Sequence, residues 1–599
     1  MQNCVNIPRP EHPNPQWERE NWVNLNGTWD FEIDNACSGE FRGLIEAPGL
    51  SGTITVPFCP ECQASGVGNK DFMNCVWYKK NISLTADQLD GNRVLFHIGA
   101  CDYETKIWVN GQSVGFSHKG GYTPIDVDIT AFVHAGGNLV TIAAYDDIRS
   151  FNQPGGKQSA QYDSYRCYYT RTTGIWQTVW YEIVPTSYIK YARFTPDLEN
   201  SSVLVEAELC GTGDFSAEVW FDGRKVGQAT KKNKSVTASL EIALSECHPW
   251  DLGQGNLYDV VLSFGQDRVK SYFGLRSIEL KDGKFYLNGK CVFQRLVLDQ
   301  GYWPETLTTA PSEEALVKDI ELGLMAGFNG ARMHQKVFEP RYIYHADRMG
   351  YMVWGEYGSW SIDISELDAV ARFLPEWLES VRRDYSHPAI ITWCPFNETW
   401  DTHFHHQDKY SREQNNDVVR IIYEQTKLAD PTRPCVDASG NYHVKTDIYD
   451  VHDYQQDPAI FKANYDRLFT EGDLEDRHHF RWRYNGRKEG VRQTWKGEPV
   501  HLSEYGGIGF KLENNDFTEG RKASWSYGTT TTSYEEFYNR YAKLTDAILD
   551  NPKIFGFCYT QLTDVEQEKN GLFTYEDRTC KFDTAILHRI NSRKAAIEE

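Results

Sequence analysis

The sequence lacks any apolar run long enough to cross a membrane, which takes ~18 consecutive apolar residues. Its beginning, MQNCVNIPRPEHPNP, also lacks the apolar core of a secretory signal. Positive charge is in deficit: 62 Lys and Arg stand against 84 Asp and Glu, a net charge of −22. Such a chain has no general electrostatic attraction to nucleic acid or to an anionic membrane surface. We therefore expect a soluble protein with neither partner.

The 14 cysteines lack the spacing of a zinc site. They are scattered, and neighbours such as Cys59 and Cys62 have no second pair at zinc-finger distance. Reduced thiols in protein cores are the favoured interpretation. A reducing cytoplasm fits that chemistry best, although a chain trimmed of an export signal would look the same.

The composition, with 40% hydrophobic and 24% charged residues, excludes long disorder as the main theme. Residues 1–187 contain short alternating runs such as VLFHIGA and TKIWVNGQSVGF, with almost no helical periodicity. The pair Asn110 and Gly111 in the second run is a hairpin signal. This pattern predicts a β-sandwich of the jelly-roll kind, and the strand-like runs of residues 188–278 predict a smaller immunoglobulin-like sandwich.

Residues 279–599 alternate strand-like and helix-like segments. Ser312, followed by Glu313 and Glu314, is typical of a helix start, and further helices are expected near residues 341–348 and around residues 375–385. A helix is also expected before the last strand, with an apolar face of Phe537, Tyr541, Leu544 and Ile548. The pattern predicts a (β/α)₈ TIM barrel with insertions. Its eight expected strands are residues 292–298, 329–333, 351–354, 389–395, 434–437, 448–452, 500–503 and 554–559.

Two glutamates follow strands of this barrel directly. Glu398 comes after IITWCPFN, and Glu504 comes after PVHLS. Catalytic groups of such barrels lie at the carboxyl ends of the strands. Paired carboxylates across a cleft are what hydrolysis of a glycosidic bond requires. A single glutamate in such a place could equally form a structural salt bridge.

Three segments resemble glycoside hydrolase family 2, which contains β-galactosidases, β-glucuronidases and β-mannosidases. They are NGTWDF, HPAIITWCPFNETW around Glu398 and SEYGG around Glu504. The resemblance covers nearly the whole chain and the same order of three domains. It implies a retaining enzyme without a cofactor, in which Glu504 is the nucleophile and Glu398 the acid/base.

The resemblance also implies roles for neighbouring residues. Asn397 would hold the substrate hydroxyl beside the reacting carbon, and Arg332 and Tyr454 would be partners of the nucleophile. Further sugar contacts are expected from Asp299, His334 and Tyr559, the last in the place of a tryptophan beneath the sugar. Arginine and tyrosine at a barrel rim can also serve packing, and Asp299 could cap a helix.

The histidines at 403, 405, 406, 478 and 479 invite a metal interpretation. None has a second ligand one helical turn away together with a carboxylate, so we expect solvated loops and no metal. The long segment after Glu504, through Trp525 and Tyr527 to TTTTS, is expected to form a lid or a subsite loop.

Two departures from the family limit the substrate. Glucuronidases of the family carry an Asn-x-Lys motif that binds the sugar carboxylate, where this chain has Glu568-Lys569-Asn570. A neutral sugar is therefore favoured. The acidic residue that the jelly-roll domain supplies is replaced by Tyr168, with Asp163 as the alternative source of that acid, and this weakens a galactosidase assignment.

The sequence thus predicts a retaining exo-β-glycosidase that removes a terminal neutral sugar from oligosaccharides or glycoconjugates, with β-galactosidase as first choice. Another family 2 specificity, such as β-glucuronidase, arabinofuranosidase or galactofuranosidase, is the alternative. A carbohydrate-binding protein without catalysis is an alternative of another class, and the presence of both glutamates weighs against it. The oligomeric state stays open, and a homo-oligomer is compatible with the sequence.

Overall fold

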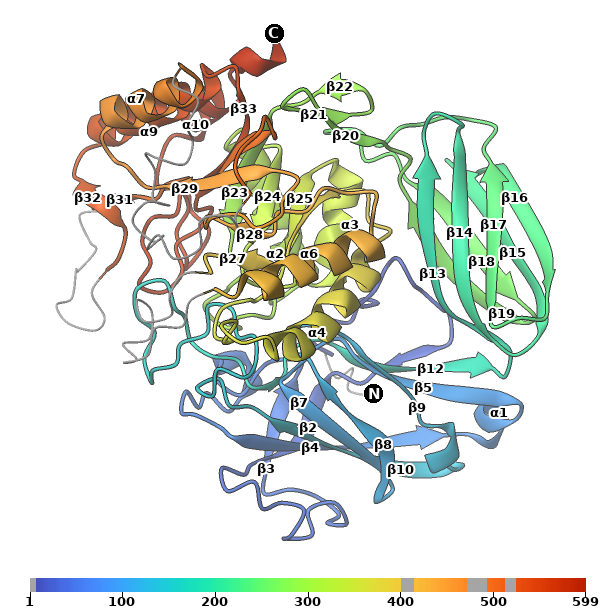
Figure 1. Ribbon diagram of the computed structural model, residues 1–599. Coiled ribbons are helices and arrows are strands. Elements are labelled where there is room, and N and C mark those ends of the chain that lie inside the picture. Colours follow the sequence, from blue (N-terminus) through green and yellow to red (C-terminus); the bar gives the residue numbers. More distant parts are fainter. Residues whose placement is uncertain (1–6, 400–413, 471–492, 512–523) are drawn as a thin grey trace.

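The computed structural model describes residues 7–399, 414–470, 493–511 and 524–599. Figure 1 shows two β-domains, in blue and in green, beside a parallel sheet with helices, in yellow to red. Strand β12 (Val179–Pro185) ends the first domain's sheets, and β13 (Tyr188–Asp197) begins the second domain's. The limits 1–187, 188–278 and 279–599 stay predictions, while the predicted fold class of jelly roll, immunoglobulin-like sandwich and barrel is confirmed.

The jelly-roll domain packs two antiparallel sheets around an apolar core that includes Trp29 and Tyr78. The predicted hairpin is present: Asn110 and Gly111 both have positive φ, 51° and 79°, as its tight turn requires. One sheet has the order β1 (Trp22–Asn24), β12, β5 (Asn92–Ile98) and β9 (Ile125–Asp128). The other has the order β3 (Gly52–Val56), β2 (Gly27–Ile33), β4 (Cys75–Leu84), β10 (Gly136–Tyr145), β7 (Glu104–Val109) and β8 (Gln112–Lys119).

The second domain is also a sandwich. Buried and more exposed residues alternate along its strands, because successive side chains of a strand point to opposite faces. One sheet has the order β13, β14 (Ser202–Cys210) and β17 (Thr237–Ala243). The other has the order β16 (Arg224–Asn233), β15 (Gly213–Phe221), β18 (Tyr258–Phe264) and β19 (Asp267–Phe273).

The third domain contains a curled parallel sheet of seven strands. Their order is β26 (Ile390–Cys394), β25 (Met352–Glu356), β24 (Gly330–Met333), β23 (Gln294–Asp299), β33 (Ile554–Thr560), β30 (Val500–Gly506) and β29 (Tyr449–Asp453). The fifth predicted strand, at residues 434–437, is much reduced. Cys435 bridges Trp393, and the short β28 (Ala438–Ser439) pairs with β27 (Phe396–Asn397). In sequence order, β27 and β28 come after β26 and before β29.

Helices follow most of these strands, as the sequence predicts. Ser312 caps α2, where its Oγ accepts a hydrogen bond from Ala315 N, and α9 buries the expected apolar face. The helix expected from residue 375 starts earlier and contains Pro375. The described helices of this domain are α2 (Glu313–Met325), α3 (Pro340–Met349), α4 (Ala369–Asp384), α6 (Asn416–Ala429), α7 (Pro458–Thr470), α9 (Tyr534–Leu549) and α10 (Thr584–Asn591).

The sequence also predicts reduced cysteines in the protein cores and no segment that crosses a membrane. The 13 cysteines of the described chain are unpaired, and most are buried. Within the same residues, no helix combines the length and the apolarity that a membrane crossing needs.

Arg19 connects the two β-domains. Its guanidinium donates to Glu182 on β12 at 2.6 Å, to Asp267 on β19 at 2.9 Å and to the carbonyl of Ile189 on β13 at 2.6 Å. All three charged side chains are at most 5% exposed. Removing one partner of a buried ion pair lowers the free energy of unfolding far more than removing one partner of an exposed pair.

We expect Arg19→Ala to destabilise the junction of the two β-domains, because Glu182 and Asp267 would remain buried without their cation. Breaking a buried pair costs about 3 to 5 kcal/mol, so the thermal midpoint should fall by several degrees. Differential scanning calorimetry measures it. The matched control is Arg224→Ala, whose side chain is 63% exposed and pairs with Glu246 at 3.0 Å. Equal shifts for the two variants would contradict the interpretation of Arg19.

Candidate active site

Glu398 and Glu504 lie at the same end of the barrel, as expected from their positions after strands. Glu504 is part of β30, and Glu398 follows β27. Glu398 takes a φ of 46°, which a residue with a side chain rarely adopts, and its N–H donates to Ser439 O at 2.8 Å. An isolated residue in this conformation costs about 1 kcal/mol and persists where the surroundings hold it, often at functional sites.

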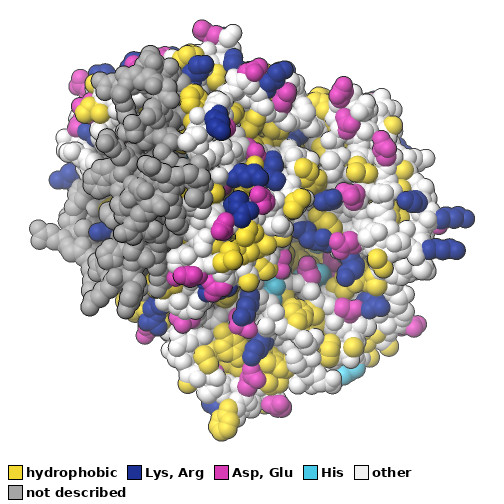
Figure 2. Space-filling model, in the orientation of Figure 1, with side chains coloured by type: hydrophobic (Ala, Val, Ile, Leu, Met, Phe, Trp, Pro, Cys, Tyr) yellow, Lys and Arg dark blue, Asp and Glu magenta, His cyan; other side chains and the backbone are white. Residues whose placement is uncertain are grey.

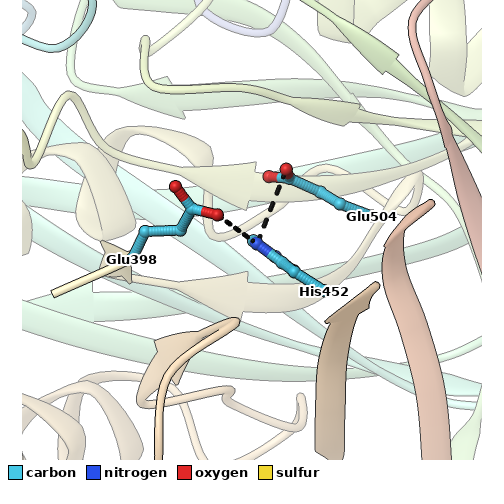
Figure 3. A group of neighbouring side chains, drawn as sticks. All are labelled: Glu398, His452 and Glu504. Carbon is cyan, nitrogen blue, oxygen red and sulfur yellow. Dashed lines mark hydrogen bonds and ion pairs between the residues drawn. The ribbon is translucent and has the colours of Figure 1, made fainter. Parts of the chain in front are cut away.

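The two carboxylates face each other across His452, a residue of β29 (Figure 3). One side-chain atom of each of the three lies within 4.8 Å of the other two. The Nδ1 atom of His452 is 2.8 Å from Glu398 Oε1 and 3.5 Å from Glu504 Oε2. The structure therefore brings together the two glutamates that are 106 residues apart in the sequence.

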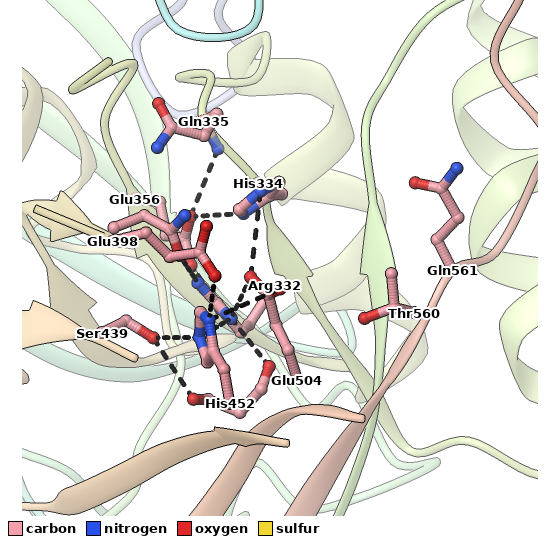
Figure 4. A network of polar contacts seen from close by, with 12 residues as sticks. Arg332, His334, Gln335, Glu356, Glu398, Ser439, His452, Glu504, Thr560 and Gln561 are labelled. Carbon is pink, nitrogen blue, oxygen red and sulfur yellow. Dashed lines mark hydrogen bonds and ion pairs between the residues drawn. The ribbon is translucent and has the colours of Figure 1, made fainter. Parts of the chain in front are cut away.

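Arg332, at the end of β24, is the centre of the surrounding network (Figure 4). Its guanidinium donates to Glu504 Oε1 at 3.2 Å, to the carbonyl of Ser503 at 2.7 Å and to Asn397 Oδ1 at 2.9 Å. It also donates to Glu356, the last residue of β25. The Arg332 side chain is fully buried, so these acceptors replace its water.

Glu356 carries the counter-charge of this network. Burial alone would raise its pKa, but Arg332 and His334 outweigh burial and lower the pKa of Glu356 to about 2. His334 Nδ1 is 3.1 Å from Glu356 Oε2, and its Nε2 is 3.9 Å from Glu504 Oε1. Burial lowers the pKa of His334. His334 thus lies between Glu356 and Glu504 and contacts the carboxylate of Glu356.

Tyr454 also contacts the expected nucleophile. Its hydroxyl donates to Glu504 Oε2 and lies 3.1 Å from Thr560 Oγ1. Its ring stacks on Tyr527 with 3.4 Å between ring centroids. Glu504 therefore accepts hydrogen bonds on both oxygens, from Arg332 and from Tyr454.

Asn397 offers a free donor beside this pair. Its Oδ1 accepts from Arg332, its N–H donates to Ser359 Oγ at 3.2 Å, and its carbonyl accepts from Trp360 Nε1 at 2.9 Å. The Nδ2 atom is buried and has no hydrogen-bond partner among the described residues. A substrate hydroxyl could accept from it.

A loop of the jelly-roll domain approaches the same site. Tyr168 packs on Trp360 with 5.2 Å between ring centroids, and the Lys157 ammonium is 5.4 Å from the centroid of the Trp360 ring. Lys157 also lies 3.9 Å from Glu568 Oε2, and both side chains are at most 7% exposed. Although burial opposes it, Glu568 raises the pKa of Lys157, so the two form a buried ion pair.

Family models cover most of the chain. The model described as the sugar binding domain of glycosyl hydrolases family 2 matches residues 23–151. The central model of that family matches residues 187–276, and its TIM barrel model matches residues 278–506. The chain belongs to glycosyl hydrolase family 2.

Curated relatives in this family carry two different names. A beta-galactosidase of Thermoanaerobacter pseudethanolicus is 25% identical over 68% of this chain and 55% of its own length. A beta-glucuronidase of Canis lupus familiaris is 24% identical over 70% of this chain and 68% of its own. The chain spans about half the length of the first relatives that it matches.

Solved structures of family 2 share the fold. A β-glucuronidase from Ruminococcus gnavus in complex with D-glucuronic acid superposes with a TM-score of 0.76 at 16% identity, over 98% of this chain and 100% of that one. An uncultured Clostridium sp. beta-glucuronidase gives 0.74 at 20% identity, over 96% and 99%. At this identity the likeness shows the fold alone.

Asp299 is not brought to the two glutamates. It is buried at the end of β23, where Oδ1 accepts from Gly301 N at 3.0 Å and Oδ2 from the hydroxyl of Tyr342 on α3 at 3.1 Å. Burial raises the pKa of Asp299 to about 7. Its carboxyl group therefore faces the helical layer, and the expected sugar contact finds no support in its partners.

Tyr559 is likewise turned away from the site. Its ring packs against Tyr541 of α9 and Tyr505 of β30, with centroid distances of 4.8 and 5.5 Å. The next residue, Thr560, contacts Tyr454 in the site instead. Because successive side chains of a strand point to opposite faces, only one of the two neighbours can face the sugar.

Sequence reasoning missed Glu356 and His452. Both are polar residues at the carboxyl ends of barrel strands, the signal that identified Glu398 and Glu504. The histidines considered for a metal lie outside the described residues, as does part of the expected lid at residues 512–523. In the described chain, the group with ligand types and spacing for a metal ion is Glu398, His452 and Glu504. Two of these are the carboxylates that glycosidic chemistry itself requires.

A separate cavity of about 700 Å³ lies where the three domains meet, between β5, β13 and the end of α4. Figure 2 shows side chains of both charge signs along this face of the molecule. Trp180, Tyr191 and Arg382 are among its lining residues. The two glutamates do not line it, so it is distinct from the candidate active site.

We expect Glu356→Gln to lower kcat/KM by about 10- to 100-fold, because Arg332 would lose a charge-assisted hydrogen bond worth ~1.5 to 3 kcal/mol. Steady-state kinetics on an aryl glycoside measures it, with circular dichroism to verify the fold. The control is Glu376→Gln. Burial raises the pKa of Glu376 to about 8, so its carboxyl is already mostly neutral at pH 7. Unchanged activity of Glu356→Gln would show that Arg332 does not need this counter-charge.

Proposed function

We propose that this family 2 protein is a retaining exo-β-glycosidase that hydrolyses a terminal neutral sugar through a covalent glycosyl-enzyme intermediate. The observation that carries the proposal is the short distance between Glu398 and Glu504. One carboxylate oxygen of Glu398 lies within 4.8 Å of one carboxylate oxygen of Glu504. Retaining glycosidases hold their two carboxyl groups roughly 5 to 5.5 Å apart, and inverting enzymes ~6.5 to 9.5 Å. The close pair supports retention.

The surroundings support different roles for the two glutamates. Glu504 accepts hydrogen bonds on its two oxygens from the buried guanidinium of Arg332 and the hydroxyl of Tyr454, which hold its carboxylate in place for attack on the sugar. Its side chain is 4% exposed, whereas that of Glu398 is 13% exposed. Glu398 is thus the better placed of the two to exchange a proton with a leaving group and with water.

The reaction then proceeds in two balanced steps. Glu504 attacks the anomeric carbon while the bond to the leaving oxygen breaks, and that oxygen takes the proton of Glu398. In the second step Glu398 takes a proton from water, whose oxygen attacks the same carbon and releases Glu504. The free Nδ2 of Asn397 can donate to the neighbouring sugar hydroxyl, a bond that strengthens as positive charge develops on the ring.

The charges near the site favour a neutral sugar. Lys157 is already paired with Glu568, and Lys569 lies 3.4 Å from Glu576 Oε1. A uronate carboxylate would need a cation that these pairs do not offer in the described structure. β-Galactosidase is our first choice among neutral specificities. β-Glucuronidase is the second candidate, because relatives of both names match the chain.

We expect Glu504→Gln to abolish turnover, since an amide cannot form the glycosyl ester. Glu398→Ala should spare activated aryl glycosides far more than substrates with poor leaving groups, because only the latter need a proton on the departing oxygen. The measurement is kcat/KM for a series of aryl glycosides, with Glu376→Gln as the buried-carboxyl control. Wild-type turnover in Glu504→Gln would refute the assignment of the nucleophile. Equal losses for all leaving groups would remove Glu398 from the acid role.

An aryl β-glucuronide should be a poorer substrate than an aryl β-galactoside at the same pH. Even ~3 kcal/mol of unmatched desolvation would reduce kcat/KM by roughly two orders of magnitude. Both substrates should be compared in the wild type and in Lys569→Ala. A preference for the glucuronide that disappears in Lys569→Ala would make this protein a glucuronidase with an altered carboxylate site.

A further inference from the structure

His452 lies within reach of both proposed catalytic carboxylates. The pairing of β29 with β30 shifts register between Val451 and His452, and the shift sets His452 opposite Glu504. The ring packs against Gly440, where an added Cβ would lie 2.2 Å from His452 Nδ1. The side chain is 2% exposed. The fold thus provides a fitted position for an imidazole between Glu398 and Glu504.

The contacts assign the ring hydrogen to Nδ1. This nitrogen faces two carboxylates, at 2.8 Å and 3.5 Å, and a carboxylate can only accept when it is ionised. The other nitrogen, Nε2, lies 3.4 Å from Arg332 Nη1, which can only donate, and 2.9 Å from Ser439 Oγ, whose hydrogen is donated to Asp450. Hydrogen on Nδ1 lets the ring donate to an ionised carboxylate, and the lone pair of Nε2 then faces the guanidinium of Arg332.

We propose that His452 is a positioning residue whose Nδ1–H donates to whichever catalytic carboxylate is ionised in each half-reaction. The inference rests on the retaining mechanism proposed above. No proton leaves His452, so each step keeps the balance already given.

The two half-reactions place different demands on this donor. Before attack, Glu504 is the anion and already has Arg332 and Tyr454 as donors. After attack, Glu504 is a neutral ester, and Glu398 carries the negative charge as the general base. Nδ1–H, at 2.8 Å from Glu398 Oε1, then holds that carboxylate in place while its second oxygen can receive the proton of water. Hydrolysis of the intermediate should therefore depend on His452 more than its formation does.

The same bond affects the pH dependence. A hydrogen bond to an ionised carboxylate favours that form, so its loss raises the pH at which Glu398 gives up its proton. The alkaline limb of the kcat/KM profile should move to higher pH without the donor. Other titratable groups face this pair from neighbouring elements and stay in place: Arg332 on β24, Glu356 on β25, Asp450 on β29, Glu504 on β30, Tyr454, Tyr527 and Lys157.

Three substitutions separate the donor from the volume of the ring. His452→Leu keeps most of the volume and removes both nitrogens. His452→Asn keeps a donor near the position of Nδ1, and His452→Gln places its amide nearer the position of Nε2. If the role of His452 is purely structural, the activities of the variants should follow side-chain volume. If the proposal holds, His452→Asn should be more active than both His452→Leu and His452→Gln.

The experiment uses the full chain and two glycosides of a sugar that the wild type hydrolyses. The 2,4-dinitrophenyl glycoside serves for the rates, and a phenyl glycoside, whose leaving group needs the proton of Glu398, serves for the pH profile of kcat/KM. For His452→Leu we expect kcat to fall about 10- to 100-fold, with a smaller fall in kcat/KM. A burst of dinitrophenolate and a glycosylated protein in the intact mass spectrum should reveal the accumulated intermediate. His452→Asn should recover at least tenfold of the lost kcat and the wild-type alkaline limb.

Two outcomes would overturn the proposal. One is an equal fall in kcat and kcat/KM in all three variants, without a burst or a glycosylated mass. The other is an alkaline limb that does not move in His452→Leu. Failure of the retaining mechanism itself shows differently, because the wild type would then release the sugar with inverted anomeric configuration, which proton NMR of the first product detects whatever the His452 variants do.

Discussion

The buried guanidinium of Arg332 is the contact on which the candidate active site depends. It donates to acceptors on three other strands. These acceptors are Glu356 on β25, Asn397 on β27, and Glu504 and the carbonyl of Ser503 on β30. A cation without water is tolerated only when acceptors surround it closely. Packing these strand ends around Arg332 therefore fixes the distances between them, and with those distances the separation of the reactive carboxylates.

The β-domains extend this arrangement. Lys157 and Tyr168, on one loop of the jelly-roll domain, pack on Trp360, whose indole holds the backbone of Asn397. The buried pair of Lys157 and Glu568 joins that loop to the segment after the last barrel strand. The proposed choice of sugar thus depends on how two domains meet, and the contacts of Arg19 help to hold the β-domains together.

Sequence patterns over a few residues predicted much of the fold and part of the candidate active site. The alternation of strands and helices gave the barrel, and polarity directly after a strand identified Glu398 and Glu504. The same rule missed Glu356, because the strand expected at residues 351–354 continues to residue 356. It missed His452 because that residue was counted as the last of a strand rather than as part of the site. Small errors in strand ends matter, since each strand presents only its last residues to the substrate.

The sequence by itself determined the order of the domains, the family and the two glutamates, because periodicity and short motifs are local properties of the chain. The tertiary structure decided which side chains meet. Thr560 rather than Tyr559 faces the site, since one step along a strand reverses the direction of the side chain. The register shift that sets His452 opposite Glu504 is likewise a product of strand pairing. Distances between residues far apart in the chain are set only when the strands pair into the curled sheet and bury their polar groups in pairs.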